Sequence, residues 1–86
     1  MKELERLLKG LANKRRLAIL KYLKNTREAT VGEIAKEIKL SFKATSKHLN
    51  ILAALDILDK EQRSLQIYYR LVVSQRPPVK HFLSFL

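Results

Sequence analysis

Hydrophobic residues repeat every three to four positions over most of this chain and every second position over one short stretch. The leucines of residues 2–9 predict an amphipathic helix, and Gly10 is a natural place for it to end. Asn13 can cap a second helix, whose apolar pattern breaks at residues 25–29, NTREA. The first part of the chain therefore reads as two helices.

Two shorter helices joined by a tight turn are predicted next. Thr30 and Glu33 have the spacing of a capping box, in which each side chain satisfies a backbone N–H at a helix start. Only Lys39 and Leu40 separate this helix from the following one, which Ser41 caps and which runs to about Leu55.

The period changes to two over residues 56–71, where one side of the chain carries Ile67, Tyr69 and Leu71. We predict a two-stranded hairpin with a charged tip around Arg63 and Ser64. Pro77 and Pro78 suit the start of a last helix, VKHFLSFL. The predicted order is α-α-α-α-β-β-α, a mainly α single domain over residues 1–86 with a small β-hairpin.

Composition adds a strong charge to this picture. The 86 residues include 18 Lys+Arg and 8 Asp+Glu, for a net charge of +10. A domain this basic attracts polyanions, nucleic acid first, although a basic surface also serves solubility. There is no cysteine for a disulfide or thiolate metal ligand, and no apolar run of membrane-spanning length. Because no nucleophile–base pair, carboxylate pair, metal cluster or phosphate loop is recognisable, we do not expect an enzyme.

Two helices with a tight turn followed by a basic hairpin form a winged helix-turn-helix. In the helix from Ser41 to Leu55, the inner side carries Thr45, His48, Leu49 and Leu52. The outer side carries short polar and basic groups that can donate to bases or phosphates. Any surface helix shows polar residues outward, but the turn, the hairpin and the charge together favour DNA binding. The predicted DNA-binding residues are Phe42, Lys43, Thr45, Ser46, Lys47, Asn50, Lys60, Arg63 and Arg16.

Some of these residues keep an alternative role. Phe42 suits a thymine methyl group or a packing position against Leu40. Thr45 is expected to lie partly in the core. Arg16, at a helix start, suits an external anion or a structural salt bridge, for example to a glutamate. Arg63, nearest the tip, is the favoured wing contact.

Three segments resemble the ArsR-type winged-helix repressors. LKGLANKRRLAILKYL resembles their entry segment, VGEIAKEIKLSFKATSKHLNILAALDIL their helix-turn-helix, and DKEQRSLQIYYRL their wing. The resemblance implies a homodimeric, cytoplasmic, nucleoid-associated regulator that binds a two-fold symmetric operator in double-stranded DNA. It also implies that the recognition helix enters the major groove, while the wing lies on the backbone or in the minor groove.

The family's first and last helices form its dimer interface, which the resemblance implies here for Leu4, Leu7, Leu8, Val79, Phe82, Leu83 and Leu86. The alternative is that the last helix covers the protein's own core.

The chain departs from the family pattern at its sensor positions. VGEIAKEI lacks the family's cysteines, and His81 is the only metal-ligating side chain of the last helix, so we expect no metal site and no cofactor. His48 suits packing or hydrogen bonding, and Asp56 replaces the usual glycine before the wing. The leading hypothesis is a sequence-specific repressor with an unknown effector. The alternative is a basic architectural or protein-interaction winged-helix protein with little sequence preference.

Overall fold

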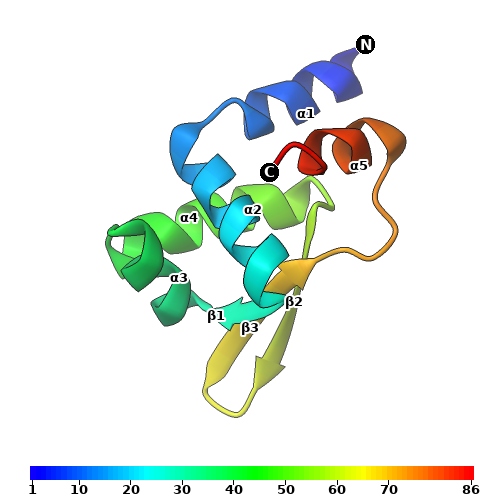
Figure 1. Cartoon of the computed structure of the whole chain (residues 1–86). Coiled ribbons are helices and arrows are strands. Elements are labelled where there is room, and N and C mark those ends of the chain that lie inside the picture. The colour runs from blue at the N-terminus through cyan, green and yellow to red at the C-terminus, as the bar shows by residue number, and fades with distance from the viewer.

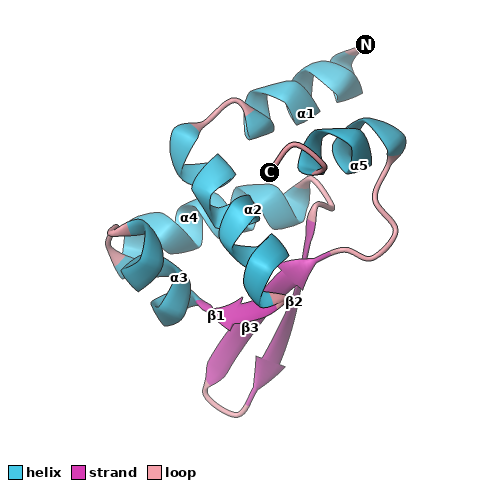
Figure 2. Ribbon diagram, viewed as in Figure 1, coloured by secondary structure: helices cyan, strands magenta, loops and turns pink.

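The computed structural model describes residues 1–86, which form five helices and a three-stranded sheet (Figure 2). The predicted order is confirmed, with one strand added between the second and third helices. The elements are α1 (Lys2–Leu11), α2 (Lys14–Thr26), β1 (Glu28–Thr30), α3 (Val31–Ile38), α4 (Phe42–Ala54), β2 (Leu58–Arg63), β3 (Gln66–Leu71) and α5 (Pro77–Leu83).

Three helices begin at the predicted caps. The side chain of Asn13 accepts hydrogen bonds from the backbone N–H groups of Arg15 and Arg16. Thr30 and Glu33 form a complete capping box, and the Ser41 hydroxyl accepts from the N–H of Ala44. These bonds satisfy donors that a helix start leaves without intrahelical partners.

The ends of α3 and α4 are Schellman turns without glycine. Lys39 has a φ of 56° after α3, and Asp56 has a φ of 60° after α4. After α4, the N–H of Ile57 donates to the carbonyl of Leu52 and that of Asp56 to the carbonyl of Ala53. Asp56, at the position where the resemblance leads us to expect glycine, therefore adopts the left-handed conformation.

The prediction that α1 ends at Gly10 is wrong, because the helix continues to Leu11. Gly10 is buried within the helix and faces Leu55 at the end of α4. A Cβ at this position would overlap the Leu55 side chain. The glycine therefore serves close packing of α1 on α4.

The sheet has the antiparallel order β1-β3-β2, with Ala29 opposite Tyr69 and Lys60 opposite Tyr69 on the other edge. The sequence prediction missed β1, because three residues carry too short a pattern to show a period. Its pairing fixes the base of the wing to the start of α3.

One apolar cluster joins the helices to the base of the sheet. Leu20, Ile34, Leu49 and Ile57 at its centre are fully buried, and Val79 and Leu83 of α5 belong to the same cluster. Figure 1 shows α1 and α5 together at one end of the molecule, while the hairpin of β2 and β3 projects from the opposite end. No helix is long and apolar enough to cross a membrane.

Candidate nucleic-acid interface

The outer face of α4 carries the predicted polar and basic side chains. Lys43, Lys47 and Asn50 are exposed, and Ser46 is half-buried between them. Phe42 is 63% exposed, so it does not fold back into the core. The inner face is anchored by Leu49 and Leu52, which are fully buried. This helix is thus fixed on one side and presents two ammonium groups on the other.

A groove of about 480 Å³ separates this outer face from the wing. Three elements line it: the start of α3, the first three turns of α4 and one face of the hairpin. Its lining includes Thr30, Val31, Gly32, Phe42, Ser46, Asn50, Lys60, Leu65, Gln66, Ile67 and Tyr69. Of the expected wing contacts, Lys60 therefore lies in the same groove as Ser46 and Asn50.

Arg63 lies on the opposite face of the wing. Its guanidinium donates to both carboxylate oxygens of Glu28 at 2.9 Å and to Glu61 at 3.0 Å, and it lies 4.4 Å from the centre of the Tyr68 ring. Arg70 also donates to Glu61, at 3.0 Å. Arg63 stays a predicted wing contact, and a duplex would have to compete with these two carboxylates for its guanidinium.

These ion pairs shift the titration of the wing. The hydrogen bond from Arg63 holds the pKa of Glu28 below its usual value. Hydrogen bonds from Arg63 and Arg70 do the same to the pKa of Glu61, and the carboxylates raise the pKa of Arg63 in return. On the face of the wing away from the groove, the charges of Arg63 and Arg70 are therefore offset by the ionised carboxylates of Glu28 and Glu61.

Thr45 lies in the core, as its alternative role predicted. Its side chain is fully buried on the inner face of α4, and its hydroxyl has no hydrogen-bond partner. It cannot touch a duplex on the outer side of the helix.

Arg16 ties three helices together and forms no bond to a glutamate. Its Nε donates to Nδ1 of His48 at 3.2 Å, and an Nη donates to the carbonyl of Gly10 at 3.1 Å. Burial lowers the pKa of His48, and the neighbouring cations Arg16, Arg15 and Lys47 lower it further. The neutral ring thus accepts the arginine bond, in agreement with the hydrogen-bonding role expected for His48, and Arg16 is a structural residue in this state.

Asn50 is coupled to the wing. The hydroxyl of Tyr69 in β3 donates to Oδ1 of Asn50 at 3.3 Å, and burial raises the pKa of that hydroxyl. The amide nitrogen of Asn50 remains available as a donor. The bond links α4 to β3, and both residues line the groove.

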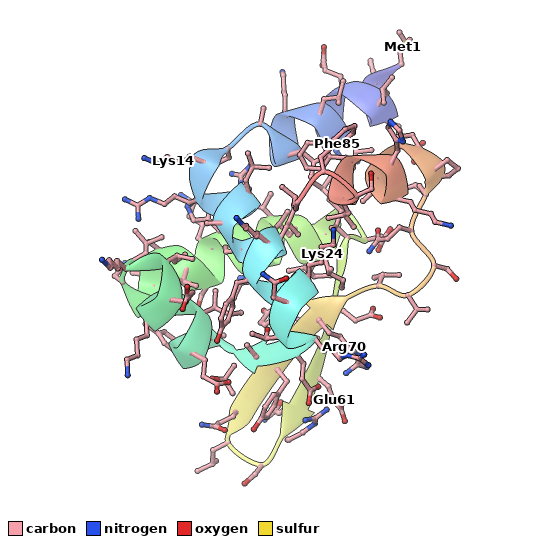
Figure 3. The ribbon with its side chains drawn as sticks, in the orientation of Figure 1. Met1, Lys14, Lys24, Glu61, Arg70 and Phe85 are labelled. Atoms are coloured by element: carbon pink, nitrogen blue, oxygen red, sulfur yellow. The ribbon has the colours of Figure 1, made fainter.

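The residues predicted for the dimer interface divide into two groups. Leu7, Val79 and Leu83 are buried within the single chain, which agrees with the alternative that the last helix covers the protein's own core. Leu4 and Leu8 are 39% and 55% exposed, and Phe82 and Leu86 are half-buried. Phe85, which the interface prediction omitted, is 75% exposed. Figure 3 labels it beside α5.

The sequence prediction also missed the start of α3 and the wing tip. Val31 and Gly32 line the groove because β1 pairs with β3 and brings α3 to the wing. Leu65 was overlooked because it lies in the loop, where the alternation of apolar and polar strand residues makes no prediction. No group of three or more His, Cys, Asp or Glu side chains is placed to hold a metal ion.

Comparison with known proteins decides the family. The profile described as "Bacterial regulatory protein, arsR family" matches residues 13–60, from the cap of α2 into β2. This chain belongs to the ArsR family.

ArsR-family relatives match beyond that segment. HlyU of Vibrio cholerae, described as a transcriptional activator, is 37% identical over 65 residues, which cover 76% of this chain and 59% of HlyU. The structure of reduced HlyU superposes with a TM-score of 0.82 at 32% identity, covering 99% of this chain and 85% of that one.

Two further structures extend the comparison. The antimony-specific transcriptional repressor AntR has a TM-score of 0.82 at 31% identity, with 98% of this chain and 73% of that chain covered. The homodimeric winged helix-turn-helix DNA-binding domain Mb0332 from Mycobacterium bovis has a TM-score of 0.81 at 26% identity, with coverage of 98% and 74%. The winged helix-turn-helix fold of this ArsR-family chain is thus established.

Proposed function

We propose that this protein is a homodimeric transcriptional repressor that binds a two-fold symmetric DNA site and occludes the adjacent promoter. One observation carries the proposal: Lys43 and Lys47 stand exposed on the outer face of α4, beside a groove that the wing residue Lys60 also lines. Lysines on an exposed helix face suit phosphates, while Ser46 and Asn50 supply short donors for base edges. Such a regulator would act in the cytoplasm, at the nucleoid.

Dimerisation is supported by the apolar side chains left exposed at one end of the chain. Leu4 and Leu8 belong to α1, Phe85 follows the neighbouring helix α5, and all three lie outside the core cluster of a single chain. Mb0332 is described as homodimeric. A two-fold dimer built on these helices places two recognition helices about 34 Å apart, one turn of DNA.

The relatives differ in the direction of regulation and in their signals. HlyU is described as an activator and AntR as an antimony-specific repressor. This chain contains no cysteine, so the regulator that we propose has no thiolate metal site.

Selection of bound duplexes from a random pool tests the function. The proposal predicts a palindromic motif with half-sites about 10 base pairs apart, centre to centre. A binder without any enriched motif would favour the second candidate, a basic architectural protein, which the net charge of +10 supports equally well. Absence of DNA binding would contradict both.

Two matched substitutions on α4 separate affinity from specificity. With about six to eight phosphates neutralised, log K should fall with log salt at a slope of about −5 to −7. Lys47→Ala should weaken selected and random duplexes alike and, because a dimer loses two lysines, make the slope shallower by about 1.8. Ser46→Ala should weaken mainly the selected duplex, by about 1 kcal/mol or more. Equal losses for both variants on both duplexes would contradict this division.

A further inference from the structure

The tip of the wing carries a leucine that is almost entirely exposed to solvent. Ser64 and Leu65 form a two-residue loop between the paired residues Arg63 and Gln66. Ser64 has a φ of 59°, as the first position of a type II′ hairpin turn requires, and Leu65 is 96% exposed. Asn, Asp, Ser and Gly are the usual residues of such turns. A leucine that is this exposed contributes no hydrophobic burial to the stability of the folded chain.

Leu65 is part of a larger apolar surface. Phe42 from α4, 63% exposed, and Ile67 from β3, 38% exposed, line the same groove as Leu65. The other large exposed apolar side chains lie elsewhere: Met1, Leu4, Leu8 and Phe85 near the chain ends, and Val73 in the loop before α5. The apolar side chains around the groove therefore coincide with the proposed DNA-binding surface.

Positive charge at the wing tip is already compensated. The guanidinium of Arg63 pairs with Glu28 at 2.9 Å and with Glu61 at 3.0 Å, on the face away from the groove. A phosphate contact at the tip would need an unpaired cation. The tip presents the apolar side chain of Leu65 instead. The apolar surface of a duplex lies in its sugar edges and its base stack, which leucine wedges reach through the minor groove.

We propose that Leu65 enters the minor groove as an apolar wedge, partly unstacks one base step and bends the bound DNA. The proposal rests on the DNA-binding function proposed above. Since TA and CA/TG steps unstack most readily, the wing would select such a step through its deformability and without hydrogen bonds to bases. Phe42 and Ile67 extend the apolar contact toward the recognition helix.

The test compares Leu65→Ser with Val73→Ser, which removes an equally exposed apolar side chain (96%) outside the wing. The probe is the duplex recovered from the random pool, labelled at both ends so that energy transfer reports its bend. Wild type and Val73→Ser should bend it equally. Leu65→Ser should bind about tenfold more weakly with a straighter duplex, and its salt slope should be unchanged because no charge is altered.

A second duplex makes the test specific to unstacking. Replacing the flexible step under the wing by a stiff A-tract should weaken wild type about tenfold and leave Leu65→Ser nearly unaffected. A general loss of folding would lower binding to both duplexes by the same factor. The wedge is overturned if Leu65→Ser binds and bends both duplexes as wild type does, or if its affinity falls by the same factor on both. Either result leaves the DNA-binding function intact. A wild type that binds no duplex from the pool would overturn the function and the wedge together.

Discussion

Thr45 places a hydroxyl in the apolar interior between α4 and the rest of the core, without a hydrogen-bond partner. An unsatisfied buried polar group costs about 1–3 kcal/mol. Thr45→Val should therefore raise the free energy of unfolding by about 1 kcal/mol and leave DNA affinity unchanged. Urea denaturation measures the first effect. Thr26→Val is the control: its exposed hydroxyl donates to the carbonyl of Tyr22 at 2.9 Å, so this substitution should not raise stability. A destabilised Thr45→Val would contradict the absence of a partner for the Thr45 hydroxyl.

His48 links stability to pH through its bond from Arg16. Because the pKa of the folded imidazole lies below 6.5, the unfolded chain binds more protons between that lowered value and 6.5. The free energy of unfolding should thus decline as pH falls from about 6.5. His48→Gln keeps an acceptor that does not titrate, so its stability should decline less over this window in parallel denaturation curves. Identical pH dependence in both proteins would contradict a neutral, bonded His48.

At the residue scale, the sequence predicted those side chains whose position follows from helical spacing. Lys43, Lys47 and the buried Leu49 follow from the period of a single helix. The intramolecular partners of Arg63 and Arg16 were not predicted because they lie far away in sequence: Glu28 is 35 positions from Arg63, and His48 is 32 positions from Arg16. Such pairs depend on tertiary contacts, which no local pattern contains.

At the scale of elements, the ion pair between Arg63 and Glu28 in the wing leads to a prediction for DNA affinity. Glu28→Gln should leave Arg63 less tightly held and remove a negative charge near the duplex, raising DNA affinity roughly two- to fivefold at low salt. Glu5→Gln is the matched control, since Glu5 forms an ion pair with Lys9 in α1, at the other end of the molecule. Anisotropy titrations should show no such gain for the control, and equal affinities for both variants would contradict a local effect of the wing.

Helix starts were predictable from single side chains, whereas packing between elements was not. Asn13, Thr30 and Ser41 cap their helices as their sequence positions indicated. Gly10 was taken for a helix end because glycine favours that position, but its contact with Leu55 is set by the approach of α1 to α4. β1 likewise exists through its pairing with β3 and not through its own sequence.

For the whole molecule, the exposed apolar residues of α1 offer the test of the proposed dimer. Leu8 is 55% exposed, so Leu8→Glu should leave the folded chain intact and convert the proposed dimer to a monomer. Sedimentation measures the mass, and Val73→Glu, at another exposed apolar position, should remain dimeric. A monomeric wild type, or a Leu8→Glu protein that stays dimeric, would contradict this interface.

The apolar residues near the C-terminus divide between the core and the exposed surface. Two buried positions of α5, Val79 and Leu83, complete the core of one chain, while Phe85 remains exposed. The sequence alone did not separate these roles, because all three are apolar residues of one short amphipathic segment. The wing projects from the end of the molecule opposite α1 and α5 (Figure 1), so dimerisation and DNA contact would use different surfaces.

Chemical-shift mapping of the nitrogen-15-labelled protein with its selected duplex tests the DNA-binding face most directly. The largest changes should occur in the backbone amides of residues 42–50 and 60–67, and changes in α5 should be small. Perturbations confined to α1 and α5, with α4 and the groove face of the wing unaffected, would contradict the assignment of this surface to DNA.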